Sequence, residues 1–296
     1  MNSIVTTKIL SQTHQFADRE WHYDFRVLFD EFEEVKIKKN VAGLSQRYSK
    51  ITKDWDSERN SEWICRVYLS AKMILSATLQ LESLLHAKQQ NLRIVAPYLE
   101  YYTFLALVRA VVYTLPEIDW NDGQLAAISH TKAVNLAYDE MAKYDKKKSS
   151  DLKRLTLDLK ANRELISYCS PSSGDGDLIA HDDIVPTATL LAELAQMNSE
   201  LLERSIQKNA KEEDCVFLPR YARQLSDLTI EGRNFFDRED RYRLGYLMRK
   251  YPLPPNILHV MTEGHVEDYF GAWCADEDDP DVFDPDSDWR LIFNVP

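Results

Sequence analysis

The first residue that could do chemistry is Arg163, because its position conflicts with its charge. Leu152, Leu155, Leu159 and Ile166 recur at helical spacing, and the same spacing puts Arg163 on their inward-facing stripe. A buried cation without a partner is costly, so this guanidinium must meet an anion, an acceptor or solvent. Two interpretations remain open. Arg163 is either salt-bridged or solvent-reaching within a helical bundle, or it binds phosphate or acts in catalysis.

A second cation, Arg109, shares one face of a predicted helix with aromatic residues. Tyr102, Ala106 and Tyr113 lie seven, three and four residues from it. A guanidinium between two tyrosines can stack on their rings and line a groove. Alternatively, the rings simply cover its aliphatic stem. Arg109, Tyr102 and Tyr113 are therefore candidate binding residues.

His130 follows Ser129, which is a suitable N-cap for the next predicted helix. The positive end of a helix dipole lowers the pKa of a histidine and favours the neutral imidazole. A neutral imidazole can act as a general base. The alternative is a surface or capping residue without a catalytic role.

Metal and cofactor chemistry has no recognisable pattern in the sequence. The histidines form neither an HExxH nor an HxH motif; they include His22, His86, His181, His259 and His265. The four cysteines, at positions 65, 169, 215 and 274, lie far apart with no CxxC pair. We therefore expect no metal site and no cofactor, and reduced thiols that are mostly buried.

The elements that must position these side chains are mainly helices, because glycine is rare (8 of 296 residues) and apolar residues recur at helical spacing. The longest periodic stretch, Ser61 to Gln90, is apolar around much of its girth, which is typical of a helix inside a bundle. The other predicted helices span residues 14–35, 97–115, 129–144 and 151–168, then a stretch from 186, and residues 219–236 and 241–249. A final amphipathic turn or two is expected within residues 257–273. Residues 41–60 are predicted as a polar linker and residues 145–150 as a turn.

Charge is concentrated at the C-terminal end. Eleven acidic residues and one arginine lie between residues 263 and 290, so this segment carries most of the net charge of −12. General attraction to nucleic acid is therefore not expected, although a local basic patch remains possible. The segment is interpreted as a solvated acidic arm with aromatic anchors at Trp273, Phe283, Trp289 and Phe293, as a nucleic-acid mimic, or as a solubilising tail. Its natural partner is the basic, aromatic helix near residues 238–250.

The N-terminal residues lack the apolar core of a signal peptide, and no window approaches the roughly 18 apolar residues of a membrane span. We therefore expect a cytoplasmic protein that does not bind a membrane.

Three segments in order resemble HEPN-type helical domains. They are PYLEYYTFLALVRAVVYTLP (97–116), SHTKAVNLAYDEM (129–141) and LKRLTLDLKANRELISYC (152–169), and the resemblance covers residues 61–174. It implies an antiparallel four-helix bundle, commonly dimeric, found in toxin-antitoxin, CRISPR-associated and phage-defence proteins. Many such domains are metal-independent ribonucleases in which an arginine and a histidine, four to six residues apart, form a site across the dimer.

Arg163 matches the arginine of that motif, but Ser167, Tyr168 and Cys169 stand where the histidine should be. Tyr168, with an ordinary pKa of about 10, is a poor base at neutral pH. His130 could replace the missing group only if the ends of two helices meet.

The resemblance therefore favours a non-catalytic, homodimeric module that binds protein or RNA in a bacterial stress or defence system, without a small-molecule cofactor. One alternative is a metal-independent endoribonuclease that uses Arg163 with His130 or Tyr168 at a dimer interface, and another is an inhibitor that acts through the acidic tail. The expected order is an N-terminal helical extension (1–60), the HEPN-like bundle (61–174), a C-terminal helical region (175–262) and an acidic aromatic tail (263–296).

Overall fold

The computed structural model describes residues 13–16, 19–250, 254–275, 282–285 and 288–295. Over these ranges the chain is mainly helical, as its composition and periodicity predict, with two small antiparallel hairpins. No helix within them is both long and apolar enough to cross a membrane.

The elements follow one another in the order β1 (His14–Phe16), β2 (Arg19–Trp21), α2 (Leu28–Glu31), α3 (Glu34–Thr52), α4 (Ser57–Gln89), α5 (Ala96–Tyr113), η1 (Gln124–Ala127), α6 (His130–Met141), α7 (Lys146–Glu164), η2 (Leu165–Cys169), α8 (Val185–Asn209), η3 (Glu212–Asp214), α9 (Pro219–Ser226), β3 (Asp227–Ile230), β4 (Arg233–Phe236), α10 (Arg238–Lys250), α11 (Ile257–Val260) and α12 (Glu263–Gly271). The segment η2 is one turn of π-helix.

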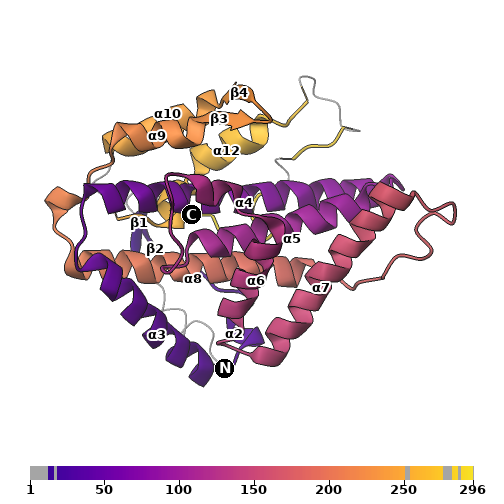
Figure 1. Ribbon diagram of the computed structural model, residues 1–296, viewed down its shortest axis with the longest axis horizontal. Coiled ribbons are helices and arrows are strands. Elements are labelled where there is room, and N and C mark those ends of the chain that lie inside the picture. Colours follow the sequence, from indigo (N-terminus) through magenta and orange to yellow (C-terminus); the bar gives the residue numbers. More distant parts are fainter. Residues whose placement is uncertain (1–12, 17–18, 251–253, 276–281, 286–287, 296) are drawn as a thin grey trace.

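Helix α5 lies at the centre of the molecule, where it packs against α4, α6, α7 and α8. Figure 1 shows α4, α5 and α8 running along the long axis, with α3 and α7 inclined at opposite ends. Helix α3 packs against α8, and α6 packs against α7. The C-terminal elements α9, α10, β3, β4 and α12 lie on the other side of α4 (Figure 1). The largely apolar surface of α4 is therefore covered on both sides, in agreement with its prediction as a helix inside a bundle.

Two predictions for the first sixty residues are wrong. Residues 41–60 are not a linker, because Ile37, Leu44 and Tyr48 are buried at helical spacing along α3. Helix α4 begins at Ser57, where the Asp56 side chain accepts a hydrogen bond from the Arg59 backbone amide. Residues 14–35 are not one helix, because they form the β1–β2 hairpin, an irregular segment and the short helix α2.

Two local predictions farther along the chain are also wrong, for reasons of turn and cap chemistry. Asp145 is the N-cap of α7, because its carboxylate accepts the Lys148 amide at 2.9 Å, so residues 146–150 are helical. Residues 219–236 are not one helix: α9 ends at Ser226, and the β3–β4 hairpin follows it. Glu231 and Gly232 form its two-residue turn with φ of 51° and 72°, the left-handed values that such a hairpin requires.

The acidic end of the chain is only partly described, because residues 276–281 and 286–287 lie outside the described ranges. Within the described part, Asp268 of α12 forms an ion pair with Arg243 of α10, so the expected contact between acidic segment and basic helix exists at this point. Of the predicted aromatic anchors, Phe293 is buried, whereas Trp273 is mostly exposed. The last described residues therefore pack on the body of the protein.

The arginine that the fold buries completely is Arg66 of α4, with 1% of its side chain exposed. Its guanidinium donates to the carbonyl oxygens of Tyr113 (2.8 Å), Leu115 and Ile118 (2.8 Å), just where α5 ends. It also stacks on Trp63, with Cζ 3.8 Å from the ring centroid. The last carbonyls of a helix have no partners within the helix, so Arg66 caps α5 from a neighbouring helix.

Helix α8 is buried on nearly every side and still carries carboxylates. Glu193, Glu200 and Glu203 are all buried. Glu193 accepts hydrogen bonds from the backbone amides of three consecutive residues, 26–28, at the start of α2. This contact holds the segment before α2 against the centre of the molecule.

We predict that Arg66→Gln lowers the free energy of unfolding by about 3 kcal/mol or more, because it removes charged donors from three buried carbonyl groups. Urea denaturation followed by circular dichroism would measure the change. Arg154→Gln is a matched control, because Arg154 is exposed on α7, and it should change stability by about 0.5 kcal/mol or less. Equal stability of the two variants would contradict the capping role of Arg66.

Candidate functional site

Arg163 lies in the last turn of α7, directly before the π-helical turn η2, and is half-buried. Its guanidinium stacks on two neighbouring rings of α5: Cζ is 5.2 Å from the centroid of Tyr101 and 5.6 Å from that of Tyr102. The helical repeat thus directs Arg163 toward α5, but onto an aromatic surface at the edge of the bundle. Single π-turns within helices often occur at functional sites.

His130 is the first residue of α6 and contacts the same two rings. Its Nδ1 lies 2.9 Å from the Tyr101 hydroxyl, and its ring centroid is 5.9 Å from that of Tyr101 and 6.4 Å from that of Tyr102. The Ser129 side chain caps α6 by accepting from the Lys132 amide, as predicted. The N-terminus of α6 and the C-terminus of α7 therefore meet at Tyr101, which brings His130 and Arg163 into one cluster.

The charges around His130 are mainly positive. Burial lowers its pKa below 6.5, and the cations of Arg109, Arg163 and Lys160 lower it further. Lys160 itself is 3.5 Å from the carboxylate of Glu164. His130 is accordingly neutral at physiological pH, the state in which an imidazole can accept a proton.

Arg109 lies on α5, and its Nη2 donates a hydrogen bond to the carbonyl oxygen of Ile128 at 3.1 Å. The Nε atoms of Arg109 and Arg163 are both buried, and neither has a hydrogen-bond partner among the described residues. Neither guanidinium forms an ion pair within the same ranges. A buried donor without an acceptor costs free energy, so each guanidinium keeps hydrogen-bonding capacity that the fold does not use.

Two predicted tyrosines have different surroundings. Tyr113 is buried and donates to the carbonyl oxygen of Ala126 at 3.2 Å, so it ties α5 to the following loop and does not face solvent. Tyr168, on η2, is 78% exposed. Burial alone would lower the pKa of Arg163, but the phenols of Tyr102, Tyr168 and Tyr101 raise it overall. Tyr168 therefore acts on Arg163 through a side-chain hydrogen bond as well as through its charge interaction.

The residues that share this environment are called the Arg–His–Tyr cluster: Tyr101, Tyr102, Arg109, His130, Lys160, Arg163 and Tyr168. The turn that carries Tyr168 also lines an open cavity of about 330 Å³, through Ile166 and Ser170. Leu92, Arg93 and Ile94, which precede α5, form its other wall. A cavity of this size lies within the range of ligand sites.

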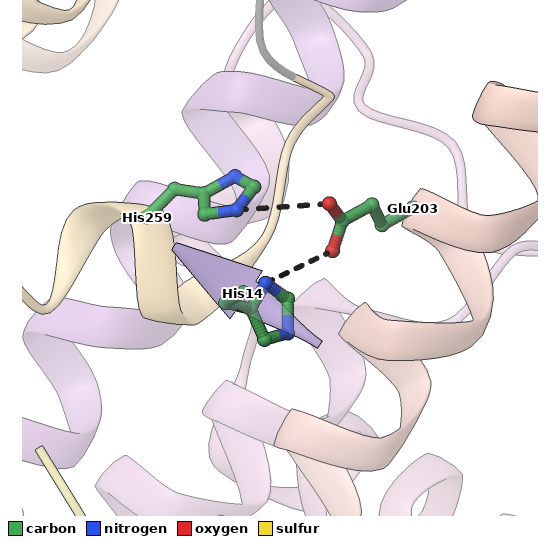
Figure 2. Close-up of side chains that lie close together, drawn as sticks. All are labelled: His14, Glu203 and His259. Atoms are coloured by element: carbon green, nitrogen blue, oxygen red, sulfur yellow. Dashed lines mark ion pairs between the residues drawn. The ribbon is translucent and has the colours of Figure 1, made fainter. Parts of the chain in front are cut away.

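A second polar cluster lies on the buried side of α8. Figure 2 shows His14 of β1, Glu203 of α8 and His259 of α11 pointing toward one another. Glu203 lies 3.9 Å from His14 Nδ1 (Oε2) and 3.6 Å from His259 Nε2 (Oε1). One ligand atom from each of the three residues lies within 4.8 Å of the others. These three side chains could hold a metal ion, although the spacing of histidines predicts none.

Sequence reasoning identified Arg109, His130, Arg163, Tyr102 and Tyr168 but missed several of their neighbours. Tyr101 and Lys160 had a local signal, since one adjoins Tyr102 and the other precedes Arg163 by less than one helical turn. The second cluster had a weaker signal: Glu193, Gln196, Glu200, Glu203 and Gln207 recur every three or four residues. This is the spacing of a polar stripe on one face of a helix that is otherwise apolar.

Comparison with known proteins finds no family model, no curated protein and no solved structure that matches this chain.

We predict that Arg163→Gln raises the pKa of His130 toward 6.5, because a cation that opposes protonation of the imidazole is removed. Histidine side-chain resonances followed by NMR across pH would measure this shift. In Arg154→Gln, which removes an exposed arginine of the same helix, the titration of His130 should match the wild type. A midpoint unchanged by Arg163→Gln would mean that the two residues are not coupled.

Proposed function

We propose that this chain is a HEPN-like module that binds RNA through the Arg–His–Tyr cluster. The observation that carries the proposal is the pair of guanidinium groups, Arg109 and Arg163, whose buried Nε–H groups have no acceptor among the described residues. A phosphodiester oxygen is a suitable acceptor, because charge-assisted hydrogen bonds between arginine and phosphate are short and strong. The resemblance of residues 97–169 to HEPN-type domains supports the same class of ligand.

The aromatic residues of the cluster favour single-stranded RNA over a free phosphate. Tyr102 is 40% and Tyr168 is 78% exposed, and both lie beside Arg163. Unpaired bases stack on exposed aromatic rings while cations hold the backbone. The net charge of −12 opposes general attraction to nucleic acid, so binding should depend on this local group of residues.

Binding can be tested by fluorescence anisotropy with single-stranded RNA oligonucleotides. Arg163→Gln should weaken binding about tenfold or more, because a hydrogen bond to a charged group is worth about 1.5–3 kcal/mol. Tyr102→Leu should weaken it through the loss of stacking. Arg154→Gln, the exposed arginine of the same helix, should bind like the wild type. Equal affinities of the wild type and Arg163→Gln would contradict the proposal.

A metal-independent endoribonuclease is a second candidate, and the meeting of His130 and Arg163 at Tyr101 favours it. In the tautomer in which Nδ1 donates to the Tyr101 hydroxyl, Nε2 carries the lone pair of a general base. It would take the proton of a ribose 2′-hydroxyl, whose oxygen attacks the adjacent phosphorus and expels the 5′-oxygen of the next nucleotide. Arg163 would stabilise the negative charge that develops on the phosphoryl oxygens.

Cleavage separates the two candidates. An endoribonuclease cuts RNA in EDTA, leaves a 2′,3′-cyclic phosphate, spares an oligonucleotide with 2′-deoxyribose at every position, and loses activity in His130→Gln and Arg163→Gln. The non-catalytic module binds the same RNA and leaves it intact. The resemblance also implies a homodimer with Arg163 at its interface, which analytical ultracentrifugation of the wild type would test.

A further inference from the structure

The second cluster joins three parts of the chain that are distant in sequence. His14 comes from the N-terminal hairpin, Glu203 from the C-terminal half of the buried helix α8, and His259 from α11 near the C-terminal end (Figure 2). The rings of His14 and His259 meet edge to face, with centroids 5.4 Å apart. Two imidazoles and one carboxylate from separate elements are a donor set that proteins use for transition metals, above all zinc.

The donor atoms lie farther apart than in an occupied site, by a distance that side-chain rotation can close. Zinc lies about 2.0–2.2 Å from nitrogen and oxygen ligands, so neighbouring ligands in a tetrahedral site are about 3.3 Å apart. Glu203 is 3.6 Å from Nε2 of His259 and 3.9 Å from Nδ1 of His14. The ligand atoms of all three residues lie within 4.8 Å of one another, so side-chain shifts of up to about 1.5 Å would close the set around an ion.

The other ring nitrogen of each histidine has an acceptor. His14 Nε2 lies 2.9 Å from a carboxylate oxygen of Glu200, and His259 Nδ1 lies 3.0 Å from the carbonyl oxygen of Pro254. A histidine that donates through one nitrogen presents the lone pair of the other, and metal-binding histidines are typically held in this way. Both remaining nitrogens, Nδ1 of His14 and Nε2 of His259, face Glu203. Asn256 and Gln207 donate to Glu203 itself and orient its carboxylate.

The charge of the cluster also favours a cation. The side chains of Glu200 and Glu203 are 0% and 5% exposed. Glu200 is paired with His14 at 2.9 Å, and a divalent ion would compensate the second buried carboxylate, that of Glu203.

We propose that His14, Glu203 and His259 bind a divalent transition-metal ion, with Zn²⁺ the best fit, which fastens the N-terminal hairpin and α11 to helix α8. Nitrogen donors favour zinc over magnesium and calcium, which take oxygen ligands. Glu200 is then a positioning residue that acts through His14.

This metal site is independent of the proposed RNA binding, because it shares no residue with the Arg–His–Tyr cluster. A structural ion is also compatible with metal-independent chemistry at that cluster. The two proposals therefore fail separately: loss of RNA binding in Arg163→Gln does not bear on the metal, and loss of metal does not bear on the arginine.

The test uses the full chain without a polyhistidine tag, stripped with EDTA and dialysed. Isothermal titration with Zn²⁺ should give one site per chain, and elemental analysis after dialysis against Zn²⁺ should find about one zinc per chain. Co²⁺ should give the visible absorption of a tetrahedral complex. Zn²⁺ should raise the melting temperature above its value in EDTA.

Variants assign the site. Glu203→Gln keeps the size of the side chain but removes the ligand charge, so metal binding and the metal-dependent rise in melting temperature should disappear, and His259→Gln should do the same. Glu200→Gln should keep one site per chain with about 10- to 100-fold weaker affinity. His265→Gln is the matched control, because His265 is a buried histidine outside the cluster, and its metal content should equal that of the wild type.

The proposal is overturned if the wild type retains no zinc after dialysis and melts at the same temperature with Zn²⁺ and with EDTA. It is also overturned if Glu203→Gln and His259→Gln retain as much zinc as the wild type, which would indicate adventitious surface binding. Should either variant fail to fold, the wild-type stoichiometry and the His265→Gln control still decide the outcome.

Discussion

Buried acidic side chains along helix α8 determine how the rest of the chain packs. A helix enclosed on nearly every side must supply each of these groups with donors, because a buried charge without partners is strongly destabilising. Glu193 meets this demand with the backbone amides of residues 26–28, Glu200 with His14, and Glu203 with Asn256. Those donors come from the two ends of the chain. The polar stripe of α8 therefore decides where the N-terminal segment and α11 pack.

Arginine side chains elsewhere in the molecule differ in their burial and in their hydrogen-bond acceptors. Arg66 is buried completely and has an acceptor for each of its nitrogen atoms, so its role is to complete α5. Arg163 and Arg109 are half-buried, and their Nε atoms have no acceptor among the described residues. The contrast distinguishes an arginine that stabilises the fold from a pair that is available to a ligand. It is also why the cluster at Tyr101, rather than the buried arginine, carries the proposed function.

Prediction succeeded where a local signal and the tertiary structure agreed. The helices α5 and α6 begin where Pro97 and Ser129 predict, because proline suits the first turn and serine caps the first amides. Prediction failed over residues 14–60, where polar composition suggested a linker and aromatic spacing suggested a helix. There the outcome depends on long-range contacts, such as those of Glu193 with residues 26–28. Single-sequence periodicity contains no information about such partners.

Local sequence patterns are enough to predict that this chain is mainly helical, where most helices of residues 61–209 lie, and that Arg163 turns toward its own bundle. These properties follow from spacing within one helix, which is a local quantity. The packing of distant elements is what places His130 and Arg163 on the rings of Tyr101 and Tyr102. It also brings His14, Glu203 and His259 together. Both meetings join elements that are far apart along the chain, and their geometry comes from how helices pack across one another.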